Sequence, residues 1–175
     1  MKKALVLSLM LLFVSGLALA KPMSFRLGGG IDLPMDDGVS TGFHGMGGID
    51  YSINPNMSIL GNLSYHSIPF DDMGITGVDI DPFSIIGING EVKYALGPEA
   101  PTRFYLLGGL GFASVKSPDM TISVMGYSTT VEGESSTEFM LSLGGGVAFG
   151  TVFVEGRYLN IDELDMITGS VGVNL

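Results

Sequence analysis

The stretch EFMLSLGGGVAFGTVFVEGRYLNI, residues 138–161, decides the fold class because two kinds of side chain alternate along it. Apolar residues occupy every second position of the first half, and Glu, Ser and Gly occupy most of the positions between them. The second half repeats this pattern after Gly150, with Glu155 and Arg157 on the polar side and valines on the other. A period of two places alternate side chains on opposite faces of a strand, so the stretch predicts a β-hairpin.

The same alternation recurs in eight runs of about ten residues each. Every charged residue within a run lies on one face, and the other face carries none. Long and short connections alternate between the runs, which predicts an all-β fold: an eight-stranded antiparallel up-and-down barrel. The runs are Ser24–Leu33, Phe43–Ile53, Met57–His66, Phe83–Leu96, Arg103–Val115, Glu138–Phe149, Thr151–Ile161 and Met166–Leu175.

Two barrel classes fit this pattern, a soluble lipocalin-like barrel and a transmembrane β-barrel. The polar face is mostly Gly, Ser, Ala and Thr, which suits a crowded interior better than a surface in water. Aromatic residues gather near the run ends on the apolar face, as they do at lipid–water interfaces. These observations favour the transmembrane barrel. The predicted aromatic girdle is Phe25, Phe43, Tyr51, Tyr65, Tyr94, Phe104, Phe112, Phe139, Phe149 and Tyr158.

Residues 1–20 have the features of a cleaved secretory signal peptide, so we expect the barrel domain to comprise residues 21–175. Lys2 and Lys3 precede an uncharged apolar stretch that ends in the small-x-small sequence Ala18-Leu19-Ala20. Removing the two lysines changes the net charge from −10 to −12. This acidity argues against nucleic-acid binding. The absence of cysteine excludes a disulfide framework and a thiolate metal site.

Three segments resemble the small outer-membrane β-barrel family of Gram-negative bacteria, which includes the OmpA transmembrane domain, OmpX and opacity-type proteins. They are YLLGGLG at 105–111, GGGVAFG at 144–150 and FVEGRY at 153–158, and an alternating strand also ends the chain. The resemblance implies an outer-membrane location among lipids and lipopolysaccharide, no cofactor, and long loops that face outside the cell. Family members usually end in Phe, and here the last residue is Leu175.

The polar faces of the runs place nine charged residues inside the barrel. An eight-stranded barrel is just wide enough for side chains to fill it, and an unpaired buried charge costs several kcal/mol. We therefore expect these residues to form ion pairs that plug the lumen, with a narrow pore as the alternative. The candidates are Arg26, Asp32, Asp50, Glu91, Lys93, Arg103, Glu138, Glu155 and Arg157.

Turn lengths give a predicted register for three hairpins. Pairing Ile53 with Met57 places His44 opposite His66 near the rim with the long loops. These two histidines either have hydrogen-bond partners in the lumen or form a metal site that Asp71 or Asp72 completes.

The last two hairpins are predicted from short turns. Pairing Ala148 with Thr151, and Ile161 with Met166, places Glu155 between Gly144 and Gly172. The same pairings place Arg157 between Ser142 and Ser170. Small residues opposite these long side chains explain the glycine excess.

Twelve of the 18 acidic residues lie in the four long connections, where Lys116 is the only basic residue. These connections form one acidic rim of the barrel. The rim could bind divalent cations that bridge to lipopolysaccharide or bind a host or surface protein partner, or its charges are simply solvated. Residues 120–124 and 128–131 alternate as well and predict a hairpin above the membrane, whose edge can bind a partner. We expect a non-catalytic role in envelope structure, surface interaction or adhesion. A lipid A-modifying barrel enzyme is the alternative. The sequence lacks the spaced His-x-Ser pair of such enzymes, which argues against it.

Overall fold

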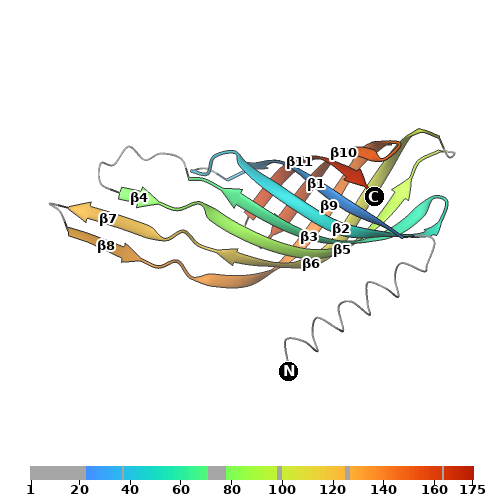
Figure 1. Ribbon diagram of the computed structural model, residues 1–175. Coiled ribbons are helices and arrows are strands. Elements are labelled where there is room, and N and C mark those ends of the chain that lie inside the picture. Colours follow the sequence, from blue (N-terminus) through green and yellow to red (C-terminus); the bar gives the residue numbers. More distant parts are fainter. Residues whose placement is uncertain (1–22, 37, 71–77, 98–99, 125–126, 163) are drawn as a thin grey trace, which may run out of the picture.

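The computed structural model describes residues 23–36, 38–70, 78–97, 100–124, 127–162 and 164–175 (Figure 1). These residues form eleven strands. No helix among them is long and apolar enough to cross a membrane. The expected signal peptide, residues 1–20, lies outside the described residues, as do Asp71 and Asp72.

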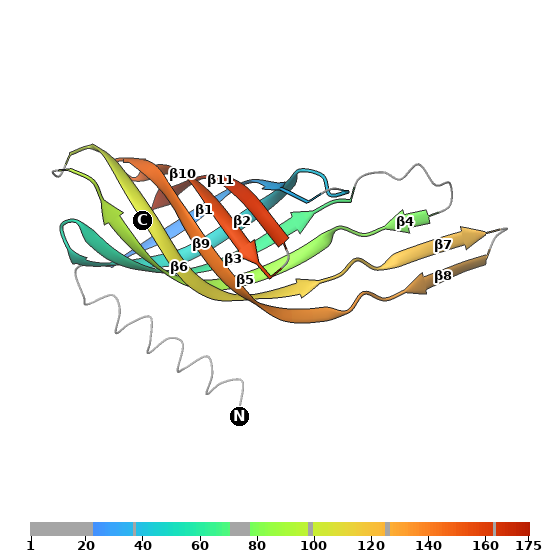
Figure 2. The ribbon, with the colours of Figure 1, turned by 180° about the vertical axis from the view of Figure 1, so that it is seen from behind.

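Eight of the strands close into an antiparallel barrel, so the predicted eight-stranded up-and-down barrel is confirmed (Figures 1 and 2). Closure occurs where the first and last strands pair, with Arg26 opposite Asn174. The barrel strands are β1 (Met23–Pro34), β2 (Gly42–Asn54), β3 (Met57–Ile68), β5 (Phe83–Ala95), β6 (Thr102–Lys116), β9 (Ser135–Phe149), β10 (Val152–Ile161) and β11 (Leu164–Asn174). We call the end with the turns β2–β3, β5–β6 and β9–β10 the turn rim, and the opposite end the loop rim.

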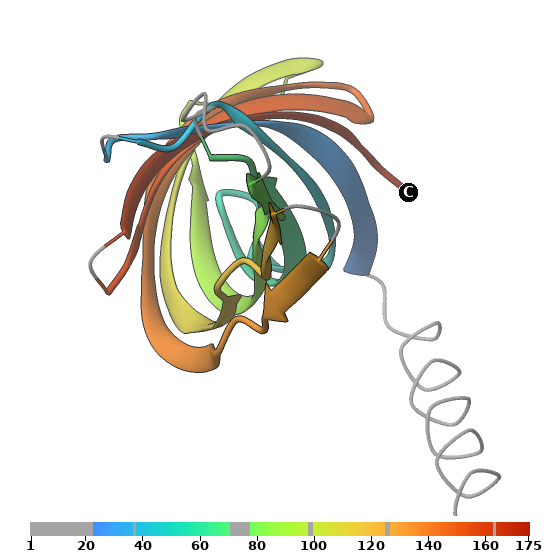
Figure 3. The ribbon, with the colours of Figure 1, turned by 90° about the vertical axis from the view of Figure 1, so that its left-hand side faces the viewer.

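Three short strands form a second sheet beyond the loop rim, here called the extension. They are β4 (Val78–Ile80), β7 (Met120–Val124) and β8 (Tyr127–Val131), in the order β4-β7-β8. Figure 1 shows β7 and β8 projecting well past the barrel, and Figure 3 shows the extension in front of the barrel mouth. The hairpin predicted from residues 120–124 and 128–131 is thereby confirmed. Strand β4 was not predicted.

The outward face of the barrel is apolar and exposed along every strand. Leu27, Ile88, Leu110 and Leu143, for example, are between 53% and 63% exposed. Because the exposed apolar surface encircles a closed barrel, it is suited to contact with lipid chains rather than water.

Nine of the ten predicted girdle residues are exposed outward, in two groups. Phe43, Tyr65, Phe112 and Phe139 lie toward the loop rim, and Phe25, Tyr51, Tyr94, Phe104 and Phe149 toward the turn rim. Neighbouring strands bring the Phe112 and Phe139 rings to 6.2 Å, edge to face. The two groups are eight to ten residues apart along a strand, which spans roughly 21–26 Å at the usual rise and tilt. That spacing fits an apolar membrane band about 25 Å tall.

Tyr158 differs from the other predicted girdle residues. It is only partly exposed, and its hydroxyl donates a hydrogen bond to Asp165 Oδ1 at 2.7 Å. The tyrosine therefore ties β10 to β11 near the loop rim.

An apolar layer fills the barrel interior at the loop rim, a feature that we did not predict. Its seven side chains are at most 4% exposed. The layer lies between the extension and the polar lumen, so it seals the barrel on the side of the long loops. The residues are Ile68, Ile85, Ala113, Met140, Leu159, Ile161 and Met166.

The predicted register of the β2–β3 hairpin is correct over most of its length. His44 lies opposite His66, although a bulge between Ser52 and Asn54 makes Asn54, not Ile53, the partner of Met57.

The predicted registers of the last two hairpins are wrong by two residues. Phe149 pairs with Val152 because Gly150, at φ 61°, occupies the first central position of a two-residue turn. Ile161 pairs with Leu164, and Asp162 takes the positive φ of 51° there. A shift of two leaves every side chain on its predicted face.

The shift changes the neighbours of the two charged residues of β10. Glu155 lies opposite Gly146 and Ser170. Arg157 lies opposite Gly144 and Thr168.

Candidate functional site in the barrel interior

The centre of the lumen is organised around Arg157, which lies between two carboxylates. Its Nη1 donates to Glu91 Oε1 at 3.0 Å, and its Nη2 donates to Glu155 Oε1 at 2.7 Å. Arg157 is 6% exposed and the two glutamate side chains are fully buried. Glu91 reaches this point from β5, on the other side of the barrel, so the ion pairs cross the lumen.

A second arginine completes this network on the side of the turn rim. Arg26 Nη2 donates to Glu155 Oε2 at 2.8 Å, and the Tyr105 hydroxyl donates to the same oxygen at 2.8 Å. The guanidinium of Arg26 also stacks on the Phe153 ring, 4.2 Å from its centroid. Glu155 therefore has two cationic partners.

Neutral side chains that we did not single out hold Glu91 in place. Asn62 Nδ2 donates to Glu91 Oε2 at 2.6 Å, and the Ser142 hydroxyl donates to Oε1 at 2.8 Å. Arg157 is the only cationic partner of Glu91 among the described residues. The period of two would have placed Asn62 and Ser142 on the inner face, but it gives no sign that they contact Glu91.

Inward glycines leave space for these long side chains. A Cβ atom on Gly144 would lie 2.9 Å from both Cα and Cγ of Arg157. A Cβ on Gly109 would lie 2.8 Å from Cγ of Glu91, and one on Gly172 would overlap the Phe153 ring. A Cβ at each of these three positions would also overlap a backbone carbonyl oxygen of the neighbouring strand, so glycine allows the close approach of both backbone and side chains.

Asp32 lies between the two histidines, closer to the loop rim. Its Oδ1 accepts from His44 Nδ1 at 2.6 Å, and its Oδ2 accepts from His66 Nδ1 at 2.9 Å. The far nitrogens of the rings bond with hydroxyls, His44 Nε2 with Ser170 at 2.8 Å and His66 Nε2 with Ser64 at 3.0 Å. All three central side chains are almost fully buried.

This cluster has the donor atoms for a divalent metal such as Zn²⁺, with ligand atoms of Asp32, His44 and His66 within 4.8 Å of one another. In the hydrogen-bonded arrangement, however, both Asp32 oxygens and all four ring nitrogens already have partners. The third ligand would be Asp32, whereas our prediction named Asp71 or Asp72, which lie outside the described residues.

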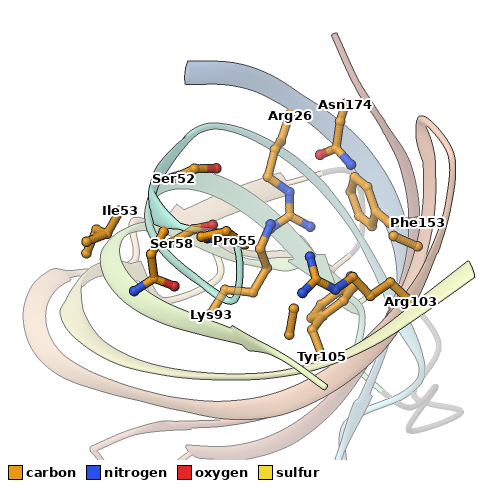
Figure 4. Close-up of a pocket in the computed structure, with 13 residues that line it drawn as sticks. Arg26, Ser52, Ile53, Pro55, Ser58, Lys93, Arg103, Tyr105, Phe153 and Asn174 are labelled. Carbon is orange, nitrogen blue, oxygen red and sulfur yellow. The ribbon is translucent and has the colours of Figure 1, made fainter. Parts of the chain in front are cut away.

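Lys93 and Arg103 lie near the turn rim, where a cavity of about 590 Å³ opens (Figure 4). Lys93 Nζ donates to Asp50 Oδ2 in a close ion pair. Arg103 Nη2 donates to the neutral oxygens of Asn56 and Gly97, at 2.6 and 3.3 Å, and forms no ion pair with any described residue.

The structure thus brings six of the nine predicted charged residues into ion pairs with one another and a seventh into hydrogen bonds with the histidines. Arg26, Asp50, Glu91, Lys93, Glu155 and Arg157 form ion pairs, and Asp32 bonds to the two histidines. Arg103 bonds only to neutral groups. Glu138 is partly exposed at the loop rim and forms no ion pair with a described residue.

A closed barrel with a charged interior and an apolar exterior identifies the class, and the sequence comparison agrees. Residues 4–175 match the family described as outer membrane protein beta-barrel domain. The chain belongs to this family. This outer-membrane barrel is therefore located in the outer membrane, with its apolar face against lipid.

Solved outer-membrane barrels show the same fold at low sequence identity. Ail, the attachment invasion locus protein of Yersinia pestis, has 15% identity and a TM-score of 0.56, over 87% of this chain and 95% of that chain. Neisserial surface protein A has 14% identity and a TM-score of 0.56, over 87% and 96% of the two chains. A structure of Ail with the heparin analogue sucrose octasulfate has 16% identity and a TM-score of 0.55, over 87% and 95%. No curated protein gives a significant match.

Proposed function

We propose that this outer-membrane barrel is a non-catalytic surface-interaction protein whose sealed barrel holds the extension outside the cell. The observation that carries the proposal is the exposed edge of β8. Outer-membrane barrels have short periplasmic turns and longer extracellular loops, so the loop rim and the extension face the exterior.

Strand β8 is an unprotected sheet edge. It pairs with β7 on one side and with no described strand on the other. Its sequence, YSTTV, contains no charge and no proline, which are the usual protections against strand addition. Thr129, Thr130 and Val131 are exposed. A partner protein could therefore add a strand here, with backbone hydrogen bonds giving affinity.

The charges around the loop rim limit the kind of partner. Asp36, Asp81, Glu132 and Glu134 are exposed, and the described basic residue near them, Lys116, is bonded to Asp119. This acidic rim favours a partner with a neutral or basic surface, or divalent cations that bridge to lipopolysaccharide. A sulfated ligand of the kind seen with Ail would be repelled.

The sealed lumen supports a role as an anchor rather than as a pore. The apolar layer fills the loop rim, and the pairs of Arg157 with Glu91 and Glu155 cross the lumen below it. An ion moving through the barrel would have to break these buried pairs, whose separation costs several kcal/mol. We therefore propose that the ion pairs act as a plug.

The test is adhesion of cells that display variants of the protein. Val131→Lys and Thr129→Lys place a charge on the β8 edge, which should strongly reduce adhesion to host cells or to other bacteria. Thr151→Lys adds the same charge at the turn rim and is the matched control. Heat-modifiable gel migration verifies that all three barrels fold. Unchanged adhesion by folded edge variants would refute the proposal.

A hydrolase is the second candidate, because Asp32, His66 and Ser64 have the hydrogen bonds of an acid–base–nucleophile triad. This set was not predicted, because the pattern expected of such enzymes was His-x-Ser and here the serine precedes the histidine. The adjoining cavity is only about 20 Å³, room for about one water molecule and not for an acyl chain. We therefore expect a serine-directed fluorophosphonate to leave the protein unlabelled. Labelling that disappears in Ser64→Ala would establish the enzyme instead.

A further inference from the structure

The cavity at the turn rim has an unusual lining. All the charged side chains that line it are cationic: Arg26, Lys93 and Arg103. Figure 4 shows their ends converging from three sides on the same space, with Tyr105 and Phe153 forming part of the wall. Its volume of about 590 Å³ lies within the range of small-molecule sites.

The charges of the described lumen do not balance at this end. Between the histidine cluster and the turn rim, the described side chains include four cations and three carboxylates, so one positive charge has no carboxylate partner. Arg103 is the residue without a carboxylate, because it bonds only to neutral oxygens. The cations are Arg26, Lys93, Arg103 and Arg157, and the carboxylates are Asp50, Glu91 and Glu155.

Hydrogen-bond donors on the two cavity arginines also have no partner among the described residues. These are Nε and Nη1 of Arg26 and Nε of Arg103. Arg26 is only 2% exposed, so its unpaired donors are costly to leave in this position. Arg157 Nε has no partner either, but both terminal nitrogens of Arg157 are bonded to carboxylates, and this residue does not line the cavity.

We propose that this cavity binds a small oxyanion, a phosphate or carboxylate group, that enters from the periplasmic side. Guanidinium groups recognise both groups through paired N–H donors, and one negative charge matches the excess. The apolar layer seals the loop rim, and the Arg26–Glu155 pair closes the side of the cavity that faces this layer. The anion must therefore enter from the turn rim. The site is at the opposite end of the barrel from the extension, so it does not depend on the proposed surface role.

Arginine-selective NMR in maltoside micelles tests the proposal directly, because the chain has only three arginines, Arg26, Arg103 and Arg157. Titration with inorganic phosphate should shift the Nε–Hε resonances of Arg26 and Arg103 saturably and leave that of Arg157 in place. A parallel titration with micelles that contain phosphatidylglycerol distinguishes a lipid headgroup from a free anion. Chloride at matched ionic strength measures screening.

Variants provide the second arm. Arg103→Gln should weaken phosphate binding tenfold or more and leave folding intact, since this arginine forms no ion pair with a described residue. Lys116→Gln removes the same charge at the loop rim, far from the cavity, and should leave phosphate binding unchanged. Resonances that stay in place, or that all shift as they do with chloride, would overturn the proposal.

Glu99 provides a further control, because it belongs to the β5–β6 connection and lies outside the described residues. The titration is therefore repeated with Glu99→Gln, which should bind phosphate as the parent protein does. If phosphate binds only to this variant, the Glu99 carboxylate is the natural partner of the cavity cations, and this result would also overturn the proposal.

Discussion

Replacing Arg157 by Met should destabilise the barrel by about 3–5 kcal/mol, the usual cost of leaving a buried charge without its partner. The two carboxylates bonded to Arg157 differ in the hydrogen-bond partners that they keep once this arginine is replaced. Glu155 keeps Arg26 and the Tyr105 hydroxyl, whereas Glu91 keeps only Asn62 and Ser142. The cost therefore falls mainly on Glu91, which is 2% exposed.

A double variant separates the charge from the packing. Arg157→Met/Glu91→Gln removes both charges and keeps side chains of similar volume, so it should regain at least about 2 kcal/mol relative to the single variant. Urea unfolding in lipid vesicles, followed by circular dichroism because the chain lacks tryptophan, measures both values. A single variant within about 1 kcal/mol of the parent, or a double variant no more stable than the single one, would refute the reasoning.

Three further predictions follow from other parts of the molecule. Gly144→Ala should cost about 1–3 kcal/mol because its Cβ would overlap the backbone carbonyl oxygen of Gly156 and crowd Arg157, whereas Gly61→Ala, with nothing within 4 Å, should be neutral or slightly stabilising in the same unfolding assay. The backbone N–H of Gly133, and then Lys116, hold the pKa of Asp119 below its ordinary 3.8. The contact between Asp119 and Gly133 therefore stabilises the base of the extension above pH 3.8 and is lost as the pH falls through the folded pKa of Asp119. The hydrogen-exchange protection factor of the Gly133 amide should fall over the same pH range, and it should also fall in Asp119→Asn at neutral pH. The parent protein should show no single-channel conductance in planar bilayers, and regular conductance steps would contradict the plug.

The side of the barrel that each residue faces could be predicted from the sequence, because the period of two depends only on local alternation. It placed Asp32, Glu91 and Arg157 inside and Phe104 outside, as the structure does. This assignment survived a register error of two residues, which preserves faces. The error arose at Gly150 and Asp162, since the position of the positive-φ residue within a tight turn decides the pairing.

Depth within the barrel and contacts across the lumen could not be predicted in this way. The apolar layer occupies positions such as Met140 and Leu159, on the face that carries charges elsewhere, and alternation gives no reason for this change. The contact of Asp32 with both histidines needs the register of three strands at once. The bond between His66 and Ser64 follows from their shared face, but only side-chain geometry shows that the atoms meet.

Surface labelling tests the central claim, that a barrel in the outer membrane presents the extension to the exterior. The chain has no cysteine, so a single introduced thiol is the only one present. Intact cells are treated with a maleimide carried on a polymer too large to pass porins. We predict that Thr129→Cys, in β8, is labelled in intact cells, and that Thr151→Cys, at the turn rim, is labelled only after the outer membrane is opened. Labelling of Thr151→Cys but not of Thr129→Cys in intact cells would contradict the account.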